Sequence, residues 1–458
     1  MLQVGALERH LDRQPIVTEI PSWKRGEVWA LFLVALSLRL IAIVALGSHG
    51  DIEGQTGWSW GREPGALGES LFRDGTLSDP WGQGTGPTAW LTPVFPALVA
   101  ICLKLFGGLT PGAAALLHVI HALVAAGTCL LLIEFGRVLG SPRAGRLAAW
   151  MFALYPASIW HAAHTVWDTT LIAAGLLGFL ILVLRAGPGP GVGRSGKLGL
   201  AFGALLMINP APVGILPFIA LYLFPGGRGA EIARRAGAFL GAALLVCLPW
   251  MIRNALVIGT PALRSNLGVE LHVGNNDAAQ GRHEAGLHPS RGGEALDRYR
   301  ALGEVAYSKQ AGEEAVRWIR ANPRRFLGLV LRRIQIFWVG ESPMADSRVS
   351  NGIQPAEDPQ SWLKWVFHLS SGGLAIAAAF LFMRGTREGL LLGGVLLLFP
   401  VPYYLTHVAE RYRFPLDPIL VFLDAWLILR ILGRRARGSV ASSAEASPSR
   451  ETSARRHG

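Results

Sequence analysis

The sequence predicts an all-α polytopic membrane protein of about 10–12 transmembrane helices. Of its 458 residues, 51% are hydrophobic and only 16% are charged, whereas soluble domains carry about 25% charged residues. Apolar runs of about 20 residues recur along the chain, which is the length that crosses a bilayer as a helix. Most of these runs lack Asp and Glu. We therefore expect them to span a membrane.

Ten runs are predicted to be spanning helices, at about 27–47, 113–134, 145–160, 169–185, 197–208, 212–224, 236–252, 366–383, 389–405 and 414–431. Lysine and arginine cluster in alternate loops between these runs, and also before the first run and after the last. The positive-inside rule places such clusters in the cytoplasm. Both termini are therefore predicted to be cytoplasmic in a multi-pass protein.

The predicted organisation has three parts. Residues 1–26 form a polar cytoplasmic N-terminus with no cleavable signal peptide. Residues 27–438 form the transmembrane domain. Residues 439–458, rich in Ser, Ala and Arg, form a disordered cytoplasmic tail.

Two long periplasmic loops, at about 48–112 and 253–361, are expected on the outer side of the membrane. Each contains an apolar stretch, at 91–107 and at 325–340. If 91–107 spanned, the basic clusters that follow would face outward. Both stretches are therefore interpreted as juxtamembrane helices that lie in the interface.

The net charge of +12 does not indicate a nucleic-acid partner, because the basic residues are spread over the loops and form no basic domain. Membrane lipid or phosphate explains them better. The three cysteines, Cys102, Cys129 and Cys247, lie in apolar stretches without CxxC spacing. They are expected to be small buried side chains.

Two carboxylates in outer loops are the candidate catalytic groups. Glu63 follows the first run, and Asp168 lies at the end of the next outward loop. Acid at a membrane surface is costly, so it indicates a function. A charge that complements a helix dipole explains Glu63 equally well, and helix capping is the simpler explanation of Asp168. Asp51 and Glu53 compete with Glu63 for its role.

Several other polar residues have a structural and a functional interpretation. His161 and His164 have the spacing to bind a metal together with Asp168, although interfacial histidines are more common without one. Arg253, Arg411 and Arg413 can hold phosphate oxygens or extend to the membrane surface. Arg39, in the first run, needs a partner, and Asp424 is a candidate for an ion pair with it.

The motifs of the chain, taken in order, resemble the GT-C superfamily of membrane glycosyltransferases. They are Ser78-Asp79-Pro80, Thr88-Ala89-Trp90, Pro93-Val94-Phe95-Pro96, Trp167-Asp168, Pro249-Trp250-Met251-Ile252-Arg253-Asn254, Gly274-Asn275-Asn276 and Arg411-Tyr412-Arg413-Phe414-Pro415. The chain looks most like the bacterial branch that contains the protein O-mannosyltransferases and the lipid A aminoarabinose transferase. The resemblance covers nearly the whole chain.

This resemblance implies an inverting transfer of a hexosyl or pentosyl group from a polyprenyl-phosphate-linked sugar to an acceptor hydroxyl. Glu63 matches the first-loop acid thought to act as base, and Asp168 matches the second acid. Many relatives have Asp in the first loop, so Asp51 stays open. The resemblance also implies which residues bind the two parts of the substrates. The donor phosphate is expected to bind Arg253, Arg411 and Arg413. The remaining substrate contacts are expected from Asn266, Glu270, Asn275, Asn276 and Tyr412.

The acceptor implied by the resemblance is a protein, a lipid or a glycan, and the active site faces the periplasm of a bacterial inner membrane. No cofactor is required, although a divalent metal is compatible with the chemistry. A transporter or flippase of lipid-linked sugars is an alternative, as is a surface-glycan ligase or polymerase. A transporter usually shows an internal repeat, and the sequence shows none.

Overall fold

The computed structural model describes residues 25–48, 62–283, 285–344, 357, 359–382 and 385–445. Its regular secondary structure is helical throughout this part of the chain, with a few isolated bridges in the loops. The predicted all-α fold is therefore confirmed. Asp51 and Glu53, the two alternatives to Glu63, lie outside the described residues.

Six helical segments are long and apolar enough to cross a membrane. They are Arg25–Ala45 (α2), Pro111–Val138 (α5), Thr169–Ala186 (α8), Gly229–Ile258 (α11), Ser361–Phe382 within α16 (Pro359–Phe382), and Arg387–Leu405, which joins α17 (Arg387–Leu398) to α18 (Val401–Leu405). All of them coincide with predicted spans. The protein is thus a polytopic membrane protein by the length and composition of its helices.

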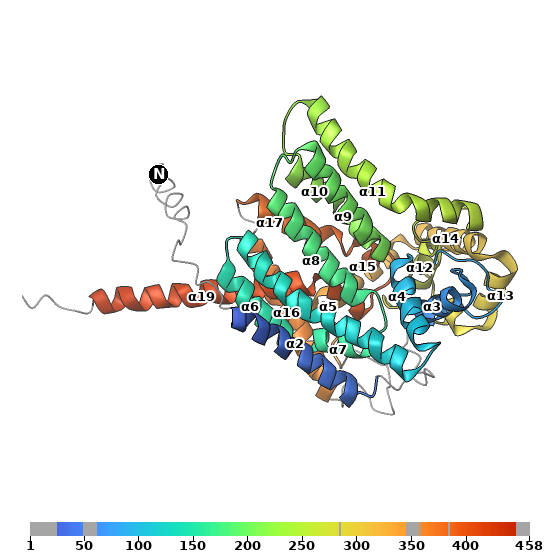
Figure 1. Cartoon of the computed structure of the whole chain (residues 1–458), viewed down its shortest axis with the longest axis horizontal. Coiled ribbons are helices and arrows are strands. Elements are labelled where there is room, and N and C mark those ends of the chain that lie inside the picture. Colours follow the sequence, from blue (N-terminus) through green and yellow to red (C-terminus); the bar gives the residue numbers. More distant parts are fainter. Residues whose placement is uncertain are drawn as a thin grey trace, which may run out of the picture.

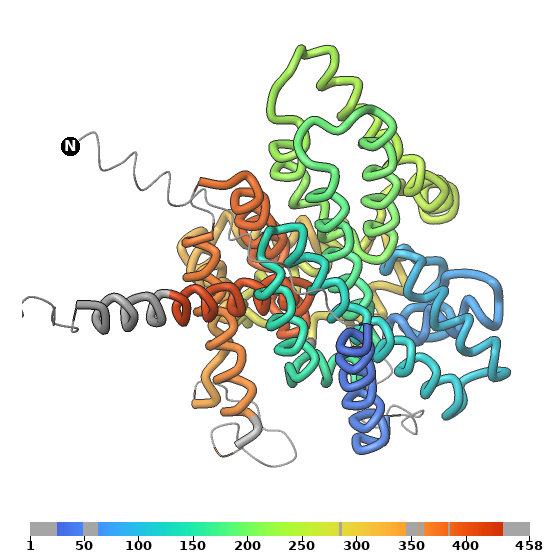
Figure 2. Tube along the Cα trace, turned by 60° about the vertical axis from the view of Figure 1, so that its left-hand side comes forward, coloured from blue at the N-terminus to red at the C-terminus, as the bar shows by residue number. Residues whose placement is uncertain are grey.

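The other predicted spans form shorter or more charged helices. These are α6 (Pro142–Leu154), α7 (Pro156–His164), α9 (Val192–Ile208), α10 (Leu216–Leu223) and α19 (Asp417–Glu445). α19 continues past Gly438, where the tail was expected to begin, and residues 446–458 lie outside the described range. Figures 1 and 2 both show α19 extending away from the body of the protein.

The helices of the bundle pack closely where small residues meet. α5 contacts α2, α6 and α8, while α9 lies along α11. Gly199 and Gly203 on α9 face the backbone of α11, where a Cβ would collide with the carbonyl oxygens of Phe239 and Ala243. Small residues four apart on one face allow this close approach in membrane helices.

The predicted span 145–160 is broken at Pro156, which separates α6 from α7. Proline lacks the N–H that would continue the helix, so carbonyls of the preceding turn lose their partners. The buried Arg39 replaces those partners. It donates to the carbonyl oxygens of Phe152 and Ala153, both at 3.2 Å, and to Ser158 Oγ at 2.7 Å. The expected ion pair with Asp424 is wrong, because these oxygens occupy the Arg39 guanidinium.

Arg39→Met is expected to destabilise the fold. The Ala153 carbonyl would lose its side-chain donor, at about 1–3 kcal/mol for a buried group left unsatisfied, whereas the Phe152 carbonyl keeps the N–H of Tyr155 at 3.3 Å. Thermal unfolding of the purified protein in detergent measures this loss. Arg25→Met, on the exposed first turn of the same helix, is the control. Equal melting temperatures for the two variants would contradict this role of Arg39.

Short helices gather at one end of the bundle, as Figure 1 shows. They are α3 (Arg62–Asp74), α4 (Val94–Phe106), α12 (Leu267–Gly274), α13 (Gly293–Leu302) and α14 (Glu304–Ala321), followed by α15 (Pro323–Val339). The stretches interpreted as juxtamembrane, 91–107 and 325–340, correspond to α4 and α15, with 13 and 17 residues. The described parts of the two long loops therefore contain several helices.

The buried Glu304 joins these two loops. Its carboxylate accepts hydrogen bonds from Ala89 N at 2.7 Å and from the hydroxyl of Thr88 in the first loop. It also accepts from the hydroxyl groups of Ser265 and, at 2.8 Å, Tyr299 in the second. A buried carboxylate needs such a set of donors. The Thr88-Ala89-Trp90 motif is therefore held against the second loop.

Candidate active site

A cavity of about 450 Å³ lies where the two long loops meet the ends of the bundle helices. Its walls come from α3, the segment before α4, the start of α8, the turn after α9, the segment around α12, and the chain between α18 and α19. Five carboxylate or guanidinium side chains line it: Glu63, Asp168, Arg264, Glu270 and Arg411. The cavity thus brings both predicted catalytic acids together with two arginines.

Asp168 precedes α8, yet its side chain makes no capping hydrogen bond. Its Oδ2 accepts instead from Asn209 Nδ2 at 2.8 Å and from Arg264 Nη2 at 3.1 Å. The capping interpretation is therefore wrong. The Asp168 carboxylate is turned into the cavity wall and forms an ion pair there.

Arg264 has donors that the protein does not use. Its Nη2 binds Asp168, but its buried Nε has no hydrogen-bond partner among the described residues. A buried donor without a partner is costly. An anion in the cavity would satisfy it.

Arg411 is held by aromatic rings. Its guanidinium lies 4.3 Å from the ring centroid of Trp167 and 5.0 Å from that of Tyr412. Burial opposes its charge, but Tyr412, Glu63 and the other cavity acids raise the pKa of Arg411 overall. Arg411 is therefore a fixed cation inside the cavity.

Glu63 and Glu270 line the cavity together. Glu63 lies in the first turn of α3, so its charge also complements the helix dipole. Glu270 accepts a hydrogen bond from Asn266 Nδ2 at 2.8 Å. Burial and the nearby charge of Glu63 raise the pKa of Glu270 to about 7, although Arg411 and Arg264 oppose this. The cavity therefore concentrates negative charge between its arginines.

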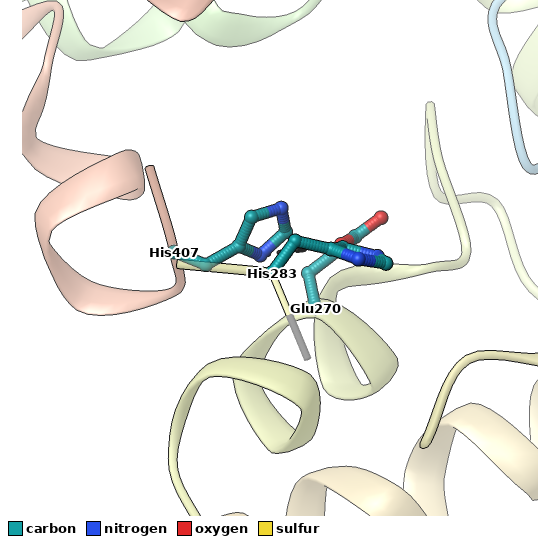
Figure 3. A group of neighbouring side chains, drawn as sticks. All are labelled: Glu270, His283 and His407. Carbon is teal, nitrogen blue, oxygen red and sulfur yellow. Dashed lines mark ion pairs between the residues drawn. The ribbon is translucent and has the colours of Figure 1, made fainter. Parts of the chain in front are cut away.

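Three histidines also line the cavity: His283, His288 and His407. Burial is the main cause that lowers the pKa of His283 to about 4 and of His288 to about 3, and it holds the pKa of His407 well below 6.5. Their rings are therefore neutral near pH 7. His283 and His407 approach Glu270 in the one group of potential metal ligands found among the described residues (Figure 3).

The alternative metal site at His161, His164 and Asp168 is wrong, since their side chains do not gather. The ring of His161 packs against Phe414, with centroids 4.4 Å apart. The ring of His164 packs against Trp160 at 4.3 Å. Helical spacing placed the two histidines near each other, but α7 turns both toward aromatic neighbours.

Arg253 and Arg413 do not line the cavity. Arg253 donates to the carbonyl oxygens of Thr88 at 2.6 Å and Leu77 at 2.8 Å, and so fixes the first loop. Arg413 is buried and forms an ion pair with Asp417 at 3.1 Å. It also donates to Tyr155, Ser371 and the carbonyl of His368. These contacts use the guanidinium groups for structure, which corrects the assignment of both to phosphate.

The predicted substrate residues divide into two groups. Asn266, Glu270 and Tyr412 line the cavity. Asn275 and Asn276 do not, because their amides donate to carbonyls at the end of α12, and Asn275 also donates to Leu405 O at 2.9 Å. The Gly274-Asn275-Asn276 motif therefore ends a helix against the chain after α18, where a Cβ on Gly274 would collide with Thr406 O.

Sequence reasoning missed Arg264, His283, His288 and His407. No local motif surrounds Arg264, whose partner Asp168 is 96 residues away. His407 precedes the Arg411-Tyr412-Arg413 motif by only four residues. That proximity was a usable signal for His407, whereas the loop that carries His283 and His288 offers none.

No protein-family model matches this chain, and a search of curated proteins finds no match. Its fold is similar to solved structures of the oligosaccharyltransferase of Archaeoglobus fulgidus. The apo form has a TM-score of 0.52 and 13% identity, over 94% of this chain and 54% of that one. The complex with Zn and sulfate has 0.50 and 12%, over 92% and 51%. The form tethered to an acceptor peptide has 0.51 and 12%, over 90% and 50%.

This similarity supports the predicted GT-C fold. At such low identity it concerns the fold, and the chain spans about half the length of those structures. Fold and site thus define a helical membrane protein whose fold is similar to that of this oligosaccharyltransferase. Its own reaction has to be argued from the cavity.

Proposed function

We propose that this protein is an inverting glycosyltransferase that moves one sugar from a polyprenyl-phosphate donor to an acceptor hydroxyl. The observation that carries the proposal is the single cavity in which Glu63, Asp168, Arg264 and Arg411 meet. Apolar side chains such as Leu91, Phe95 and Ile172 also line this cavity and suit the apolar part of such a donor. The fold similarity to an oligosaccharyltransferase supports the same reaction class.

The donor phosphate is proposed to lie between Arg264 and Arg411. Arg411 is oriented by two rings, and Arg264 offers an unused buried N–H. Planar guanidinium groups suit phosphate oxygens. These two arginines replace Arg253 and Arg413 as phosphate ligands, whereas Arg411 keeps the role expected from the sequence.

The proposed step is a direct displacement. The acceptor oxygen attacks the anomeric carbon, and the bond from that carbon to the phosphate oxygen breaks with its electron pair on the phosphate. Glu63 takes the proton of the acceptor hydroxyl, and the arginines stabilise the charge on the leaving phosphate. Attack opposite the phosphate inverts the anomeric centre.

Asp168 is proposed to position Arg264. Asp168→Asn removes the charge from this pair, and hydrogen bonds to charged groups contribute about 1.5–3 kcal/mol. We expect at least about a tenfold loss of transfer, with KM for the donor raised. Steady-state kinetics with varied donor measures this. Asp277→Asn, at an exposed site outside the cavity, is the control, and unchanged kinetics in Asp168→Asn would contradict the role.

The proposed orientation follows the basic loops, with the cavity on the periplasmic side of a bacterial inner membrane and both termini in the cytoplasm. The acceptor is left as a protein, lipid or glycan hydroxyl. A divalent metal is compatible with the cavity, since one similar structure holds Zn and the cavity has a candidate ligand group. In the proposed displacement, Glu63 takes the proton, and Arg264 and Arg411 stabilise the leaving phosphate.

Purified protein given a radiolabelled polyprenyl-monophosphate sugar tests the proposal. The expected result is release of free polyprenyl phosphate together with a new glycoside. Turnover of only a polyprenyl-diphosphate donor would favour a glycan ligase or polymerase. Movement of intact lipid-linked sugar across proteoliposomes, without cleavage, would favour a flippase. Either of these two results would overturn the proposed reaction.

A further inference from the structure

We propose that Glu270, His283 and His407 form a binding site for one divalent transition-metal ion of the zinc type. Their potential ligand atoms all lie within 4.8 Å of one another. Figure 3 shows the three side chains close together, from α12, from the loop after it and from the chain after α18. The ligand set is separate from the residues proposed to bind the phosphate and accept the proton.

The distances already approach those of a metal site. His407 Nδ1 lies 3.6 Å from Glu270 Oε2. Two ligands at about 2.0–2.1 Å from a tetrahedral zinc ion lie about 3.3 Å apart. A shift of a few tenths of an ångström would therefore bring this pair to coordination geometry.

His407 is the strongest evidence that an ion belongs here. Its side chain is 2% exposed, and its Nδ1 has no hydrogen-bond partner among the described residues. The other ring nitrogen, Nε2, lies 3.0 Å from the hydroxyl of Tyr412. Metal-binding histidines are commonly oriented by such a bond at the second nitrogen. The buried Nδ1 is thus aimed at Glu270 with its hydrogen-bonding capacity unused.

The donor set selects the kind of ion. Two imidazoles and one carboxylate suit zinc and its neighbours, whereas Mg²⁺ and Ca²⁺ prefer oxygen ligands alone. Three protein ligands leave a fourth position open, and all three residues line the cavity. An oxygen of the donor phosphate is expected to take that open position. This role rests on the proposed function, whereas the existence of the ion site does not depend on it.

The site is tested by metal binding to the whole purified protein in detergent, without donor or acceptor. The protein is stripped with a chelator and equilibrated with Zn²⁺ alone or Mg²⁺ alone. Elemental analysis then gives the bound stoichiometry, and thermal unfolding gives the stabilisation that selective binding to the folded state produces. We expect about one Zn²⁺ per chain, a higher melting temperature with Zn²⁺, and no stoichiometric Mg²⁺.

The variants His283→Ala and His407→Gln should each weaken Zn²⁺ binding by at least about tenfold, as even the loss of an orienting partner costs 10–100-fold. His283 lies in a loop and is partly exposed, so His283→Ala is expected to fold. It therefore tests the site even if His407→Gln misfolds. His288→Gln is the matched control, because this cavity histidine lies outside the ligand group.

Wild-type protein that takes up no stoichiometric Zn²⁺ would overturn the inference. Equal Zn²⁺ binding by wild type, His283→Ala and His407→Gln would also overturn it, as would an equal loss in His288→Gln. None of these outcomes bears on sugar transfer, because no donor is present. Absence of transfer with intact Zn²⁺ uptake would instead count against the proposed function alone.

Discussion

Glu63→Gln is expected to lower the rate of sugar transfer by about 10²–10⁴-fold, the usual contribution of a general base. Glutamine keeps the size of the side chain but cannot accept the proton of the acceptor hydroxyl. Glu63 lines the same cavity as both arginines. The loss should therefore fall on kcat, with little change in KM for the donor. Single-turnover measurement with a polyprenyl-phosphate sugar separates the chemical step from donor binding.

Glu69→Gln is the matched control for this prediction. Glu69 lies on the same helix, α3, but its side chain is 53% exposed and near Arg73, outside the cavity. It should transfer sugar at the wild-type rate. Full activity in Glu63→Gln would remove Glu63 from the mechanism. Asp51 and Glu53 would then be the next residues to replace.

Arg411→Gln is expected to reduce kcat by about 10²–10³-fold, the range seen when one donor that stabilises developing charge is removed. The departing phosphate gains negative charge as its bond to the sugar breaks. Arg411 is positioned by Trp167 and Tyr412 before the donor arrives, so its charge stabilises this state without rearrangement. Measurement of kcat and KM for the donor in the purified variant checks the prediction.

Arg411→Lys adds a sharper comparison, since it keeps the charge and loses the planar fork and the ring contacts. Its activity should lie between those of Arg411→Gln and wild type. Arg325→Gln, at a guanidinium 47% exposed and outside the cavity, should behave as wild type. An Arg411→Gln variant with unchanged kcat would show that the leaving phosphate is stabilised elsewhere.

The helical framework could be predicted because it follows from local composition. The apolar runs at α2, α5 and α8 are continuous in the sequence, and their length alone indicates a span. The break at Pro156 was not predicted, because apolar residues continue on both sides of the proline. Arg39 shows why the fold tolerates that break. Its partner is a set of carbonyls on another helix, and no sequence pattern identifies such carbonyls.

The candidate site was predicted only in part. Glu63 and Asp168 were found because acid is rare near the apolar runs, and Arg411 because it opens a motif before the last helix. Arg253 and Arg413 looked identical to Arg411 in sequence, but their guanidinium groups point to carbonyls and to Asp417. Which arginine reaches the cavity depends on how distant loops fold together. The direction of a flexible side chain is not encoded in its neighbours along the chain.

The most direct test of the central claim is a structure of the protein with bound polyprenyl phosphate, determined by electron cryomicroscopy in a lipid nanodisc. The predicted result is phosphate density inside the cavity, within hydrogen-bond distance of Arg411 and Arg264, with the Glu63 carboxylate facing the position of the sugar. Phosphate bound beside Arg253 or Arg413, or outside the cavity altogether, would contradict the assignment of this cavity as the site of transfer.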